Sequence, residues 1–141
     1  MKMGRRSFVS LGALALAGRV PPAAAARPAL KPITVASGAC GFEREPMVRP
    51  FGFKGGYLTE EWIVSACLRS TGGRHGIGLG TQSVLWSDAR VFTSNSEAGG
   101  NALMFALTQR ALNLARGMTF TTPVALTDAL WPQVWEYGKK V

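Results

Sequence analysis

The feature that most constrains the fold is a strand pattern followed by a tight turn. Residues 58–70 (LTEEWIVSACLRS) alternate so that one face carries Trp62, Val64, Ala66 and Leu68. This alternation is typical of a half-buried β-strand. Residues 71–74 (TGGR) contain paired glycines, which accept the positive φ angles of a hairpin turn. Residues 75–80 (HGIGLG) then return as a second strand, whose alternating glycines allow close approach to the backbone.

The segments around this hairpin are predicted to be one more strand and two loops. Residues 33–40 are a strand candidate built mostly from small side chains. Residues 41–56 are rich in proline and glycine and are predicted to form a long loop, of a length that is usually functional or mobile. Residues 81–93 are predicted to form a second loop.

Two helices are expected after the strands. Ser94 and Glu97 have the spacing of a capping box, and an apolar stripe predicts a helix from Glu97 to about Arg116, with Gly117 after its end. Thr122 and Pro123 predict the start of a shorter helix. Proline inside a helix removes a hydrogen bond, so Pro132 is expected to break or kink that helix.

The order of these elements predicts an α+β domain, with a three-stranded antiparallel meander followed by a small helical bundle. The 141 residues suffice for one domain. They exclude a complete (β/α)₈ barrel, which needs roughly 200–250 residues.

Residues 1–26 have the three parts of a secretory signal peptide, which leaves residues 27–141 as the mature chain. A basic start precedes an apolar run at 7–18 and small residues at 23–26. Arg5, Arg6 and Phe8 resemble the twin-arginine signal, which implies export of the folded protein to the periplasm. Twelve apolar residues are too short to cross a bilayer core of about 30 Å, so no stable membrane anchor is expected.

Charge and candidate reactive residues argue against several functions. The net charge is +8, but four of the basic residues precede residue 27 and the others are scattered, so no nucleic-acid partner is expected. His75 is the only histidine and is predicted to be a polar strand residue rather than a metal ligand. Cys40 and Cys67 could form a disulfide in an oxidising compartment, but two free thiols are favoured. We predict no catalytic residue and no metal site.

Residues 51–70, 76–87 and 94–117 together resemble the N-terminal capping domain of the enolase superfamily, in the mandelate racemase and muconate lactonizing enzyme group. The glycine-alternating end of the strand after a long second strand is the most telling part. Thr81 stands where Glu often follows the last glycine in that family. The resemblance extends over residues 33–141.

The resemblance implies a division of labour between two domains. In this family a barrel holds the bases and three acidic Mg²⁺ ligands that remove a proton α to a carboxylate, in racemases, dehydratases and cycloisomerases. The capping domain supplies two loops that close over the barrel and select the small carboxylate substrate. Those loops correspond here to residues 41–56 and 81–93. The expected substrate or lid contacts are Arg49, Lys54, Gln82 and Trp86.

The barrel itself is not recognised in the sequence, which lacks a lysine-x-lysine strand end and carboxylates spaced over successive strands. The chain is therefore expected to bind no catalytic Mg²⁺ and to be inactive alone, either as a truncated product or with its barrel encoded separately. An exposed apolar docking patch is expected, with candidates Phe51, Phe53, Trp86, Val91 and Phe92. The alternative is an independent exported α+β binding or structural domain, with a closed core and no catalytic role.

Overall fold

The computed structural model describes residues 30–53 and 55–141. The predicted signal residues Arg5, Arg6 and Phe8, and the predicted contact residue Lys54, lie outside the described residues. The elements in chain order are β1 (Ile33–Phe53), β2 (Gly56–Ser70), β3 (His75–Gln82), the 3₁₀ turn η1 (Val84–Trp86), α1 (Ala89–Ser94), α2 (Glu97–Ala115), β4 (Thr119–Phe120) and α3 (Pro123–Gly138).

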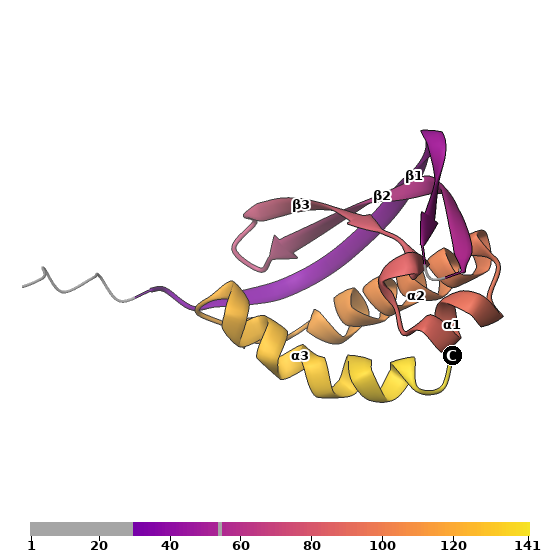
Figure 1. Cartoon of the computed structure of the whole chain (residues 1–141). Coiled ribbons are helices and arrows are strands. Elements are labelled where there is room, and N and C mark those ends of the chain that lie inside the picture. The colour runs from indigo at the N-terminus through magenta and orange to yellow at the C-terminus, as the bar shows by residue number, and fades with distance from the viewer. Residues whose placement is uncertain (1–29, 54) are drawn as a thin grey trace, which may run out of the picture.

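The strands form one antiparallel sheet in the order β3-β2-β1-β4. Helices α2 and α3 lie together on one side of this sheet, and the hairpin of β1 and β2 curls upward at the opposite end from the start of β1 (Figure 1). The α+β class is therefore confirmed, and the sheet has a fourth strand, of two residues, beyond the three that were predicted.

The first strand is much longer than predicted. Residues 41–53, expected to be loop, continue β1 and pair with β2 as far as Phe53 opposite Gly56. The two prolines are accommodated because the register shifts between Pro46 and Phe51, and proline is tolerated at such irregularities. The predicted long loop is therefore wrong, and a two-stranded arm takes its place.

The β2–β3 hairpin is confirmed. The turn between the strands contains Gly73 with a φ of 79°, the left-handed conformation that favours glycine. Val64 and Trp62 are buried on the face toward the helices, as the alternation predicts.

The second predicted loop, residues 81–93, is also wrong in part. It contains the end of β3, the turn η1 and most of α1. Helix α1 is only six residues long and begins at an aspartate cap, where the Asp88 carboxylate accepts a hydrogen bond from the Arg90 N–H. So short a helix has little periodicity from which to predict it.

The long helix α2 has nearly the predicted bounds but a different cap. The Ser96 side chain, rather than that of Ser94, accepts a hydrogen bond from the Gly99 N–H at 3.1 Å. Glu97 is the first helical residue and contacts β2 instead of closing a capping box. Gly117 follows α2 with a φ of 82°, as predicted for a helix end.

The start of α3 is confirmed, because Thr122 caps the helix through the Ala125 N–H and Pro123 is its first residue. Of the break or kink predicted at Pro132, the break is wrong, because α3 continues through this residue to Gly138. Pro132 is exposed, so its ring projects into solvent rather than against a neighbouring element.

Two buried apolar clusters hold the layers together. One joins Leu58, Val84, Leu85 and Phe92 at the hairpin end of the sheet, with Met47 and Met104 packed against it. The other joins Val35, Ala115 and Leu126 at the end where β1 begins.

Candidate functional site

The tip of the β1–β2 hairpin and the η1–α1 segment, far apart in the sequence, meet at one end of the molecule. Leu58 follows the hairpin tip and packs against Val84 and Leu85 from η1 and Phe92 from α1. Gly56 is required by this contact, because a Cβ there would lie 2.7 Å from the Phe92 ring. The two segments that correspond to the predicted loops are therefore packed against each other.

Helix α2 holds η1 in place through a buried hydrogen bond and a close contact at a glycine. Asn101 is fully buried, and its side-chain oxygen accepts a hydrogen bond from the Val84 N–H at 2.7 Å. Gly100 allows this close approach, since a Cβ at that position would lie 2.3 Å from Val84 Cγ2. The buried Ser83 hydroxyl accepts a hydrogen bond from the Leu85 N–H at 3.2 Å and caps the turn.

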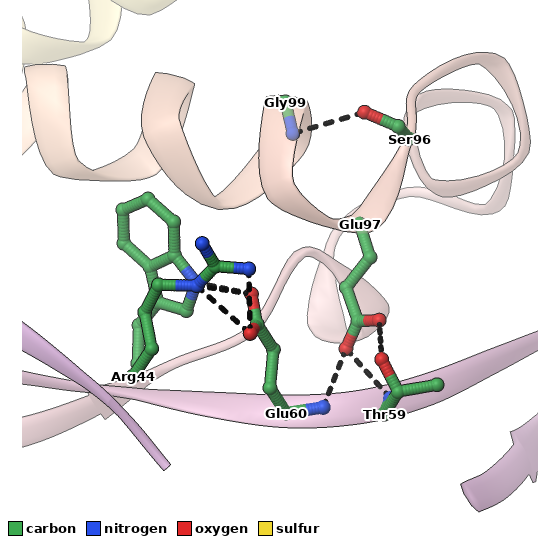
Figure 2. Close-up of polar contacts among 7 residues, drawn as sticks. Arg44, Thr59, Glu60, Ser96, Glu97 and Gly99 are labelled. Atoms are coloured by element: carbon green, nitrogen blue, oxygen red, sulfur yellow. Dashed lines mark hydrogen bonds and ion pairs between the residues drawn. The ribbon is translucent and has the colours of Figure 1, made fainter. Parts of the chain in front are cut away.

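Glu97 ties the start of α2 to the start of β2 (Figure 2). Its carboxylate accepts hydrogen bonds from the Thr59 N–H at 2.7 Å and the Glu60 N–H at 3.0 Å. The Thr59 hydroxyl donates a third, to the other oxygen. Hydrogen bonds to an ionised carboxylate are stronger than those between neutral groups. Glu97 is therefore a clamp between helix and strand.

A second polar group lies next to this clamp and joins the two long strands. The Arg44 guanidinium donates to both carboxylate oxygens of Glu60, at 2.8 and 3.0 Å through Nε (Figure 2). The Trp62 indole N–H donates to Glu60 at 2.9 Å. Hydrogen bonding to Arg44 and then to Trp62 lowers the pKa of Glu60, because both donors stabilise the ionised form.

Aromatic and aliphatic side chains remain exposed above this packed base. The Phe51 and Phe53 rings lie 6.2 Å apart, and the Phe53 ring lies 6.2 Å from that of Trp86. Trp86 is 69% exposed, and Val91 is also exposed. We call Phe51, Phe53, Trp86 and Val91 the aromatic tip. Phe92, predicted to belong to the exposed patch, is instead buried beneath it because its ring packs on Gly56.

The predicted contact residues lie in different parts of the structure. Trp86 belongs to the aromatic tip, and Arg49 is exposed on the hairpin between Pro46 and Phe51. Gln82 is half-buried at the end of β3, where its amide donates to the Met104 carbonyl and to the Thr108 hydroxyl at 2.8 Å. Gln82 is therefore held against α2 rather than directed at the aromatic tip.

The described residues do not fit a magnesium site. Residues 30–53 and 55–141 contain no group of three histidine, cysteine, aspartate or glutamate side chains that could hold a metal ion. Asp88, the carboxylate nearest the tip in sequence, accepts hydrogen bonds from Arg90, and Glu60 and Glu97 are also engaged in hydrogen bonds. His75 is exposed at the start of β3, as predicted for a polar strand residue. The arrangement offers an apolar contact surface.

Helices long and apolar enough to span a membrane are not found in the part of the chain that the structure describes. Comparison with family models, with curated proteins and with solved structures yields no match for this chain.

The supporting residues Asn101 and Glu97 were not identified from the sequence as parts of this site. The buried Asn101 lies in an α-helix between Gly100 and a run of apolar residues, which gives a weak signal for a polar residue that binds another element. The spacing of Ser94 and Glu97 fits a capping box, so the sequence gives no sign that Glu97 binds a strand instead.

Proposed function

We propose that this chain is a capping domain of the mandelate racemase and muconate lactonizing enzyme type, which covers a catalytic barrel and selects a small carboxylate substrate. The observation that carries the proposal is the aromatic tip. Two segments separated by about thirty residues of chain, β1–β2 and η1–α1, meet there and present apolar side chains outward. These are the segments that the resemblance assigns to the substrate-closing loops.

The packing beneath the aromatic tip supports a role in closing over another surface. An exposed aromatic patch on a rigid base is typical of a protein interface or ligand contact. The base is rigid because Leu85 and Asn101 are fully buried and Glu97 binds the start of β2. Arg49, exposed on the same hairpin, supplies a positive charge that suits a carboxylate substrate. The chemistry itself, with its Mg²⁺, is assigned to the barrel.

The first test asks whether a barrel exists as a partner. The DNA that follows the codon for Val141, and the neighbouring genes, are searched for a barrel with three acidic metal ligands. The full chain and that barrel are then produced together and assayed for exchange of the α-proton of a panel of carboxylates with solvent deuterium. We expect Mg²⁺-dependent exchange only when both parts are present. Exchange by the chain alone, or the absence of any barrel, contradicts the proposal and favours an independent domain.

The second test asks whether the aromatic tip selects the substrate. In the two-part enzyme, Trp86→Ala is expected to raise KM about tenfold while kcat changes less, because it removes a binding contact and no catalytic group. Trp131→Ala is the matched control, since Trp131 is also exposed but lies on α3. Equal effects of the two variants contradict a role for the tip.

Export is a separate part of the proposal, based on Arg5, Arg6 and Phe8. A fusion of residues 1–32 to a folded fluorescent reporter is expected to reach the periplasm. The double variant Arg5→Lys, Arg6→Lys is expected to retain the reporter in the cytoplasm. Unchanged export of the double variant contradicts the twin-arginine route.

A further inference from the structure

The outer edge of β3 lacks the features that normally prevent strand-to-strand association. β3 is the last strand of the sheet, and every one of its residues pairs with β2 without a register shift. Its other side therefore presents unpaired backbone donors and acceptors. The sequence HGIGLGTQ contains no lysine, acidic residue or proline, and the strand has no bulge. Proteins commonly use these devices to protect an edge.

The side chains of β3 from His75 to Thr81 are also exposed. Ile77 and Leu79 are 69% and 77% exposed, although both are large and apolar. They pair with Cys67 and Ser65 of β2, so they lie on the sheet face opposite the helices. Gly76, Gly78 and Gly80 alternate with them on the face toward the helices, where a Cβ would meet nothing within 4 Å.

We propose that the β3 edge pairs in antiparallel fashion with β3 of a second copy of this chain, about a twofold axis at Gly78. This register sets Ile77 opposite Leu79 of the other copy, and Leu79 opposite its Ile77, on the same sheet face. Glycines lie opposite glycines on the other face. A twofold interface must be complementary to itself, and this strand satisfies that condition. The resulting sheet continues through both copies.

The charges on the sheet face opposite the helices favour the same pairing. At the β2–β3 turn, Arg69 pairs with His75 on this face, and Arg74 follows in the turn. At the other end of the face Glu45 pairs with Glu61, and Glu43 pairs with Ile63. Antiparallel pairing brings the basic end of each copy alongside the acidic end of the other. Opposite charges across an interface fix its register.

The first experiment measures association of the full chain by sedimentation over a range of concentrations. We expect a monomer–dimer equilibrium. Leu79→Lys is expected to raise the dimer Kd by at least about tenfold, because it removes two symmetric apolar pairs and adds charge to the edge. Val124→Lys is the matched control: Val124 is 67% exposed, lies on α3 and is expected to leave the Kd unchanged. A monomer at all concentrations, or equal effects of both variants, overturns the proposal.

The second experiment fixes the register and does not depend on the folding of Leu79→Lys. Gly78→Cys places one thiol beside its symmetry mate, so oxidation is expected to yield a disulfide-linked dimer. Gly76→Cys is equally open in the structure but faces Gly80 of the other copy. It is expected to link poorly alone and efficiently when mixed with Gly80→Cys.

The wild-type chain, with Cys40 and Cys67, sets the background of both reactions. The β3 pairing is overturned if Gly76→Cys and Gly78→Cys link equally, or if neither links above that background. It is also overturned if the chain associates through the apolar residues 7–18 and Gly78→Cys does not link. Because the proposal concerns the β3 edge, its outcome is independent of the capping-domain proposal.

Discussion

The two ends of the sheet are built in opposite ways. At the hairpin end, the space between sheet and helices is filled by Leu58, Val84, Leu85 and Phe92, with Asn101 and Glu97 supplying polar ties. At the other end, β3 presents glycines to the helix side, and a groove of about 560 Å³ remains there. Its apolar walls include Leu68, Leu112 and Phe120. The hairpin end is thus filled by side chains, whereas at the other end a groove stays open under β3 beside the buried cluster of Val35, Ala115 and Leu126; we call this second end the hollow end.

At the filled end, the free energy of unfolding depends on the packed side chains. At the β3 glycines, only the backbone contributes to it. Substitutions at the filled end must disturb packing, because interiors are close to crystal density. Substitutions of the β3 glycines at the hollow end meet open space. The predictions below compare matched changes at the two ends.

The largest effect is expected for Leu85→Ala. Leu85 is fully buried, so truncation leaves a cavity and is expected to lower the free energy of unfolding by about 2–5 kcal/mol. Val124→Ala, at the exposed start of α3 near the hollow end, is expected to change it by less than about 0.5 kcal/mol. Urea denaturation followed by circular dichroism measures both. Similar losses would show that Leu85 is not part of a tightly packed core.

A smaller contrast is expected when a methyl group is added to a glycine at each end. Gly100→Ala would set a Cβ 2.3 Å from Val84 Cγ2, and is expected to cost about 1–3 kcal/mol despite the helix preference for alanine. Gly78→Ala meets no atom within 4 Å and is expected to be neutral or stabilising, by about 0.4–1 kcal/mol. Thermal unfolding of both variants checks the signs. If Gly100→Ala stabilises the protein, η1 can move away from α2 at little cost in free energy.

The Glu60 group predicts sensitivity to acid at the filled end. Its pKa in the folded state lies below the ordinary value of 4.5, chiefly because of Arg44, so ionised Glu60 stabilises the fold. This contribution is fully present above the ordinary pKa and is lost as the pH falls through the folded value. Melting temperatures measured from neutral pH into that acid range should therefore fall less steeply for Glu60→Gln than for the wild type.

Glu43→Gln is the control for this comparison. Glu43 lies on the opposite face of the sheet, with no ion-pair partner among the described residues, and the variant should keep the wild-type slope. If the melting temperatures of the wild type and Glu60→Gln fall in parallel with pH, Glu60 is not the source of the acid sensitivity.

The smallest effect is expected from oxidation. Cys40 and Cys67 are both free, as the sequence analysis favoured. Cys40 pairs with Ala66, the neighbour of Cys67, so the two thiols lie on opposite faces of the sheet and cannot bond within one molecule. Burial also raises the pKa of the Cys40 thiol. Reducing agent should leave the melting temperature of the monomer unchanged, and thiol titration of monomer kept under mild oxidant should still find both thiols.

The elements that local patterns define were predictable from sequence. The alternation around Trp62 and Val64 predicted β2, and paired glycines predicted its turn. The cap at Thr122 and Pro123 predicted the start of α3. The errors arose where tertiary contacts override local preference. Pairing with β2 extends β1 past Pro46, and packing of Phe92 on Gly56 stabilises the short helix α1.

The candidate site was predictable only in outline. Exposed Phe51, Phe53 and Trp86 were anticipated as a patch, but Phe92 was misplaced because burial of one ring depends on a glycine about thirty-six residues earlier in the chain. The clamp of Glu97 on Thr59 likewise joins residues whose proximity exists only after folding. No local spacing encodes such a contact.

The glycine row of β3 also has a dynamic consequence. In the monomer, Gly76, Gly78 and Gly80 supply no side chain that anchors the strand to the helices, so β3 is held by its backbone ladder to β2 and, at its end, by the hydrogen bonds of Gln82 to α2. A segment with so little buried surface opens locally at a free-energy cost well below that of global unfolding. Its amide protons should exchange with solvent ahead of those of the central β1–β2 pairs, so β3 is the part of the sheet that first releases its hydrogen bonds.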